Sequence, residues 1–172
     1  MSKWYILYVK NNYEHSIAQY INTFEAVYAF VPTRIKLYKR LGKYVKVNDI
    51  LMKNYVFIET ELNPEDFFTN IIQHLRVNTG FLKVLLYPDK QIETILPEEK
   101  AFLKSFMNKD HVIETSSGLI EGDQILITSG PLVGKESLIK RIDRHKRIAI
   151  CEVTLMGRIQ EVKLSLEILT KT

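Results

Sequence analysis

Four short apolar segments, separated by residues that favour turns, restrict the fold of the C-terminal part of the chain. The turn residues are Gly122-Asp123, Ser129-Gly130-Pro131 and Gly157, and the segments between them are rich in β-branched side chains. The four segments are residues 124–128, 137–142, 148–155 and 160–166. Short strands with a turn about every eight to twelve residues are typical of a small closed or half-closed β-barrel.

The loop between the second and third segments is strongly basic. It carries six potential cations, with only Asp143 against them. They are Lys140, Arg141, Arg144, His145, Lys146 and Arg147. Such a cluster on one turn of a small barrel suits phosphate groups, so this loop is a candidate nucleic-acid surface. The other interpretation is a solvated hairpin tip.

The first hundred residues or so alternate strand and helix patterns. Residues 3–9 are β-branched and aromatic, which predicts a strand. Helical spacing joins the apolar residues Ile17, Tyr20, Ile21 and Phe24. Asn63-Pro64 followed by two acids is a typical helix start, and another helix is expected from Pro97. Further strands are expected at 29–31, 54–59 and 81–86. This order predicts an α+β domain.

A second basic tract runs from Arg34 to Lys53, with seven Lys or Arg residues against Asp49 alone. Strand-like residues on both sides of Gly42 predict a β-hairpin with a charged tip. Two interpretations stay open at this point. The hairpin is either an exposed ribbon kept soluble by its lysines or a nucleic-acid contact.

Between residues 108 and 118 the apolar periodicity fades into Lys, Asp, Thr, Ser and Gly. This composition is typical of a linker. The sequence therefore predicts an N-terminal α+β domain over 1–107, a linker over 108–118 and a β-barrel domain over 119–172.

Composition excludes several classes of protein. Hydrophobic content of 46% and charged content of 26% are ordinary for a folded globular protein, which argues against disorder. The net charge of +4 and pI near 9.0 fit a polyanionic partner. The single cysteine, Cys151, excludes an internal disulfide and predicts a packed thiol. Without a membrane-spanning run or a signal-peptide pattern, we expect a cytoplasmic protein with no membrane partner.

The sequence lacks the usual signatures of an enzyme. Its four histidines have no second ligand at metal-binding spacing: His15, His74, His111 and His145. There is also no phosphate-loop glycine pattern and no nucleophile elbow. We therefore expect no catalytic residue, no metal and no cofactor.

Motifs in both halves of the chain resemble the bacterial NusG family of transcription elongation factors. Gly122-Asp123 and Gly130-Pro131-Leu132 resemble its KOW domain, a small SH3-like β-barrel. Lys3-Trp4-Tyr5 and the strand at 54–59 resemble its N-terminal domain. General factors usually carry Pro-Gly where this chain has Lys53-Asn54. The resemblance is therefore closer to specialised paralogues such as RfaH and the antiterminator LoaP.

This resemblance implies that the N-terminal domain binds the clamp helices of the largest catalytic subunit of RNA polymerase. The matching residues are Tyr8, Tyr55 and Phe57, and Leu51 and Phe81 are expected nearby on the same surface. Aromatic side chains are good anchors for such an interface, although a strand aromatic that packs in the core is the alternative. Lys10 and Arg76 match positions that lie near the non-template DNA strand in the specialised paralogues, or they are solvated surface residues.

In the general factors the KOW domain carries Phe-Gly-Arg, which serves coupling to Rho or a ribosomal protein; here the residues are Met156-Gly157-Arg158. With that aromatic lost, the basic turn and Arg158 favour RNA, in particular a structured leader, as the ligand. We therefore expect a monomeric antitermination factor that promotes read-through of terminators. The alternatives are a general elongation or pausing factor and a KOW-containing ribosomal RNA-binding protein.

Overall fold

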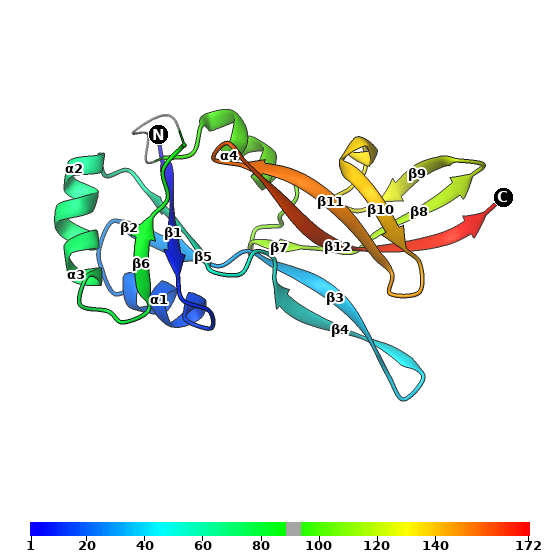
Figure 1. Cartoon of the computed structure of the whole chain (residues 1–172), viewed down its shortest axis with the longest axis horizontal. Helices are drawn as coiled ribbons and strands as arrows, with labels where there is room; N and C mark the ends of the chain where they lie inside the picture. Colours follow the sequence, from blue (N-terminus) through cyan, green and yellow to red (C-terminus); the bar gives the residue numbers. More distant parts are fainter. Residues whose placement is uncertain (89–93) are drawn as a thin grey trace. The chain divides into compact units, whose positions relative to one another are not determined.

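The computed structural model describes residues 1–88 and 94–172. They form two compact units (Figure 1). The first unit combines Met1–Val31 with Met52–Lys100, and the second combines Pro32–Leu51 with Ala101–Thr172. Sheets and a few short helices make up the chain, so the predicted α+β class is confirmed. Among the described residues, no helix has the length and apolar character needed to cross a membrane.

The first unit is built on a four-stranded antiparallel sheet in the order β2-β5-β1-β6. Its strands are β1 (Lys3–Val9), β2 (Val27–Phe30), β5 (Tyr55–Thr60) and β6 (Phe81–Val84). The four residues from Trp4 to Leu7 are all fully buried. Because successive side chains of a strand point to opposite faces, both faces of this sheet carry core residues.

Helical segments cover one face of this sheet. They are α1 (Glu14–Ile21), α2 (Pro64–Phe67), the π-helical η1 (Phe68–Ile72) and α3 (Gln73–Leu75), and the last three run on without a break. The Asn63 side chain accepts a hydrogen bond from the Asp66 N–H at 2.9 Å, which confirms the predicted helix start. The Tyr5 ring stacks on Phe67 with centroids 3.8 Å apart, so this segment packs directly on β1.

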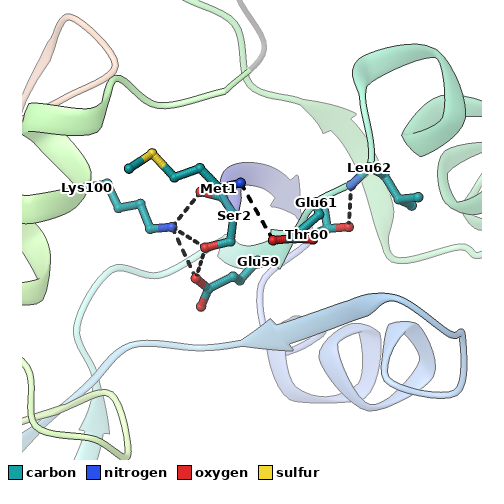
Figure 2. A network of polar contacts seen from close by, with 7 residues as sticks. All are labelled: Met1, Ser2, Glu59, Thr60, Glu61, Leu62 and Lys100. Carbon is teal, nitrogen blue, oxygen red and sulfur yellow. Dashed lines mark hydrogen bonds and ion pairs between the residues drawn. The ribbon is translucent and has the colours of Figure 1, made fainter.

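A polar network joins the start of β1 to β5 and to α4 (Pro97–Lys104). Figure 2 shows the Lys100 ammonium donating to the carbonyl and hydroxyl oxygens of Ser2, both at 2.8 Å, and to Glu59 Oε1 at 3.1 Å. The same ammonium lies 5.3 Å from the centre of the Trp4 ring. A lysine with three donors and an adjacent ring face is well satisfied here, so it fixes the beginning of the chain against the sheet.

The second unit contains a five-stranded sheet in the order β10-β11-β12-β8-β9. Its elements are β8 (Ser116–Glu121), β9 (Gln124–Ser129), the 3₁₀-helix η2 (Glu136–Leu138), β10 (Ile139–Asp143), β11 (Ile148–Leu155) and β12 (Arg158–Lys171). The long β12 pairs antiparallel with β11 up to Ser165 and parallel with β8 from Leu166 onward. One strand thus links two ladders, and β9 and β10 remain as edges. The third and fourth predicted segments are strands, whereas the segment expected at 137–142 begins as η2.

The predicted basic hairpin is confirmed as β3 (Thr33–Arg40) and β4 (Lys43–Ile50). Leu41 and Gly42 form its turn with positive φ angles of 49° and 78°, the pattern of a type I′ turn. The hairpin belongs to the second compact unit, where β3 pairs in parallel with β7 (Val112–Ile113).

The segment 108–118 is not the plain linker that its composition indicated. It contains β7 and the first residues of β8, and both take part in sheets. A strand of two residues is too short to show periodicity, which is why the sequence pattern missed it. The domain boundaries at 107 and 119 stay a prediction.

Candidate nucleic-acid interface

The basic turn between β10 and β11 is closed by its only acid. The Asp143 carboxylate accepts a hydrogen bond from the Lys146 N–H at 2.9 Å, and this bond holds the pKa of Asp143 below its ordinary value. Arg147 ends the turn with a φ of +54°, and its N–H lies 3.3 Å from the Arg144 carbonyl oxygen. A turn followed by a left-handed residue is a common hairpin connection. Asp143 therefore shapes the turn and is engaged in local bonds.

The hairpin β3–β4 packs beside this turn. The Arg147 guanidinium lies over the Tyr44 ring, 3.8 Å from its centroid, and bonds Glu167 at 2.7 Å on another side. The Tyr44 hydroxyl reaches the His145 carbonyl oxygen at 3.5 Å. Tyr44 and the basic turn are about a hundred positions apart in the sequence, so no local pattern indicated that they meet.

Buried polar bonds anchor the base of the hairpin to β12. Arg34 is only 7% exposed, pairs with Asp49 at 3.0 Å and donates a hydrogen bond to the Lys163 carbonyl oxygen. The Ser165 hydroxyl donates to the Ile35 carbonyl oxygen. Because Ser165 pairs with Ile148, the first residue after the basic turn, this anchor lies next to the turn.

A groove runs between the hairpin and the basic turn. Five Lys or Arg side chains line it against two carboxylates, those of Asp143 and Glu167. The basic lining residues are Lys39, Arg141, Arg144, Lys146 and Arg147, together with His145. Both acids are already bonded to groups of the turn itself. The excess of cations makes the groove suited to a polyanion.

The structure brings together five of the seven residues that the sequence predicted for RNA: Arg141, Arg144, His145, Lys146 and Arg147. Lys140 is not among the lining residues and lies 3.5 Å from Glu152. Arg158 follows the turn at the other end of β11 and donates to the Met156 carbonyl oxygen. Eight strand residues separate the two ends, which is about 25 Å. Arg158 is therefore not part of this groove. Lys39 and Tyr44 come from the hairpin, for which the sequence allows both a solvated ribbon and a nucleic-acid contact.

A second candidate surface lies on the sheet of the first unit. Tyr8 and Tyr55 are direct cross-strand partners on β1 and β5, and their ring centroids are 5.8 Å apart. Lys83 pairs with Tyr8 from β6, with its ammonium 6.0 Å from the ring centre. Both tyrosines are half-buried. They form an aromatic pair that is partly open to a partner.

The other three residues expected on this surface do not extend the exposed aromatic pair. Phe57 is 1% exposed and packs edge-on against Trp4 and stacked against Phe30, so it is a core residue, the alternative that the sequence left open. Phe81 pairs with Val9 and lines a shallow groove with Phe68 and Ile72 of η1. Leu51 belongs to the other compact unit.

The remaining predictions concern single residues. Lys10 and Arg76, expected near DNA, are both exposed. Cys151 is fully buried, and burial raises the pKa of its thiol to about 11, which fits a packed thiol. Within residues 1–88 and 94–172, no group of three or more His, Cys, Asp or Glu side chains could hold a metal ion.

Comparisons with known proteins identify the family. Residues 2–104 match the family described as transcription termination factor NusG. A solved structure of Thermotoga maritima NusG, from work on domain interaction in that protein, is 19% identical, with 98% of this chain and 94% of that chain covered and a TM-score of 0.49. A comparison with curated protein sequences gives no match. Because the matched residues are more than half of the 172 in the chain, it belongs to the NusG family of transcription factors.

Proposed function

We propose that this chain is a specialised transcription antitermination factor of the kind represented by RfaH and LoaP. It binds the clamp helices of RNA polymerase through the four-stranded sheet of the first unit. It binds RNA through the basic groove of the second unit. Membership of a family of polymerase-binding transcription factors supports the first contact. The observation that carries the second is the groove, where five Lys or Arg side chains face two acids that are already bonded.

The polymerase contact rests on Tyr8 and Tyr55. A partly exposed aromatic pair held by cross-strand pairing loses little side-chain entropy when a partner covers it. Such a contact resists opening of the polymerase clamp and so favours continued elongation. It uses no catalytic residue and no cofactor, and it acts in the cytoplasm where transcription occurs.

The RNA contact rests on the geometry of the basic turn. Arg144 and Lys146 are exposed, while Arg147 is held between Tyr44 and Glu167. Guanidinium groups pair with phosphate in a fork, so a turn that presents two arginines suits the RNA backbone. A structured leader RNA bound here recruits the factor to particular operons. Lys10 and Arg76 provide additional contacts to non-template DNA.

Titrating a fluorescein-labelled RNA stem-loop with the full chain tests the RNA contact. Arg144→Ala combined with Arg147→Ala removes two groove cations. We expect affinity to fall about tenfold, on the basis of roughly 0.7 kcal/mol for each exposed charge pair. The slope of log affinity against log salt should decrease by about 0.9 for each lost phosphate contact.

Lys140→Ala combined with Arg158→Ala is the matched control. It removes one lysine and one arginine from the same unit, at positions outside the groove. We expect it to leave the RNA affinity close to that of the wild type. Equal effects of the two double variants, or no effect of either, would contradict RNA binding in this groove.

A further inference from the structure

The RNA contact proposed above uses the basic turn, and the hairpin β3–β4 beside that turn has no part in it yet. We propose that it forms the second wall of the RNA site, so that one sugar-phosphate backbone lies in the groove between Lys39 and Tyr44 on one side and the turn on the other. This inference rests on the proposed RNA contact and assigns the hairpin a part in it.

The hairpin is built into the unit at the point where the groove begins. Arg34 is almost fully buried and bonds both Asp49 of the hairpin and the Lys163 carbonyl oxygen of β12. The Ser165 hydroxyl bonds the Ile35 carbonyl oxygen two residues further along β12. A buried arginine with two acceptors requires a fixed geometry, because moving the hairpin would leave its charge without partners. The wall is therefore present before RNA arrives.

Tyr44 is a positioning residue for Arg147. Its ring supports the guanidinium from one face at 3.8 Å, and Glu167 engages one edge at 2.7 Å. A guanidinium has five N–H donors, so this arrangement leaves donors for a phosphate while restricting the motion of the side chain. Holding a flexible arginine in place before binding reduces the entropy that binding must remove.

Lys39 adds a cation on the hairpin side of the groove. It pairs directly with Tyr44, so the two side chains emerge on the same face of the ribbon. Lys43 and Arg40, the next pair toward the tip, point to the opposite face because side chains alternate along a strand. The groove lining agrees with this alternation, since it contains Lys39 and Tyr44 and neither residue of the next pair.

The composition of the walls indicates contact with the backbone of the RNA. The Tyr44 ring is already covered by Arg147 on one face, whereas cations stand on both walls. Phosphate contacts fix the position of a nucleic acid without reading its sequence. We therefore expect groove binding to depend steeply on salt and weakly on the bases placed in it.

Four single variants of the full chain test the second wall, with the same labelled RNA stem-loop. Lys39→Ala should weaken binding about three- to fivefold and lower the salt slope by about one, as the loss of one exposed phosphate contact predicts. Tyr44→Ala should weaken binding to a similar degree, whereas Tyr44→Phe keeps the ring and should restore wild-type affinity. Lys43→Ala removes the same charge from the opposite face and should bind as the wild type does.

The outcomes separate this inference from the proposed function. If Lys39→Ala and Tyr44→Ala behave like Lys43→Ala while the Arg144 and Arg147 double variant loses affinity, the hairpin is no part of the site and the RNA contact stands. If the double variant also binds normally, both proposals fail. Equal weakening by Lys39→Ala and Lys43→Ala, with an equal change of slope, would show a general charge effect and overturn the second wall.

Discussion

The aromatic pair on the N-terminal sheet and the basic groove of the C-terminal unit are built in opposite ways. Tyr8 and Tyr55 are neighbours through regular strand pairing, and further along the same face of the sheet Phe57 packs against Trp4 in the core. The groove joins a turn and a hairpin that are far apart in the sequence, through a few polar bonds made by Arg34 and Ser165.

This difference has a physical consequence for each surface. Removing the buried Phe57 ring beside the aromatic pair disturbs a packed core, so the cost appears as lost stability. Removing a polar bond between the hairpin and β12 loosens the hairpin while the four-stranded and five-stranded sheets stay intact. The cost therefore appears mainly in the local order of the groove. Variants in the core beside the aromatic pair should therefore mainly lower the free energy of unfolding, whereas variants at the hairpin anchor should mainly lower RNA affinity.

The largest expected effect is that of Phe57→Ala. Because Phe57 packs on Trp4 and Phe30, we expect the free energy of unfolding to fall by about 3–5 kcal/mol in urea denaturation. Tyr55→Ala removes a half-buried ring and should cost less stability than Phe57→Ala. Recovery of RNA polymerase with the purified chain should fall more in the Tyr55 variant than in the Phe57 variant. A Tyr55 variant that loses as much stability as the Phe57 variant and binds polymerase normally would contradict this division.

An intermediate effect is expected at the hairpin anchor. Arg34→Ala leaves Asp49 and the Lys163 carbonyl oxygen without their partner. This loss should lower the free energy of local unfolding of the hairpin by about 1–3 kcal/mol. Amides of β3 and β4 should then exchange hydrogen faster, and RNA affinity should fall as it does in Lys39→Ala. Lys36→Ala, on the same strand and outside the groove lining, serves as the control. Unchanged exchange in the Arg34 variant would mean that this bond does not hold the hairpin.

The smallest effect concerns Asp143 and pH. Its pKa is lowered in the folded chain by the Lys146 N–H, so the stabilisation is present above the ordinary carboxyl pKa and is lost as pH falls through the folded value. The amide signal of Lys146 should shift when the chain is titrated below about pH 4. Asp143→Asn keeps an acceptor and should abolish this titration. A Lys146 amide that titrates equally in both proteins would exclude Asp143 as the cause.

Strand and helix patterns predicted most of the fold. The strands at 3–9, 54–59 and 148–155, the capped start at Asn63 and the hairpin about Gly42 are confirmed because each depends on local alternation or turn chemistry. The strands β7 and β8 were missed, since a short strand among Ser, Thr and Gly residues is defined by its pairing partners.

The candidate sites were predictable only in part. Charge counting along the chain located the basic turn, yet it could not exclude Lys140, which contacts Glu152 of β11, or Arg158, which lies at the far end of β11. Nor could it place Tyr44 beside Arg147, because that contact is a product of tertiary packing. Alternation put Phe57 and Tyr55 on one face, but exposure along that face is set by the neighbouring Trp4 and Phe30.

The most direct test of the central claim is to crosslink the chain in its host cells and to identify both the attached RNA and the polymerase recovered with it. We expect RNA polymerase together with one or a few leader RNAs, and loss of those RNAs in the Arg144→Ala and Arg147→Ala double variant. Uniform coverage of nascent transcripts would contradict an operon-specific antiterminator and indicate a general elongation factor. Ribosomal RNA recovered without polymerase would contradict the proposed function altogether.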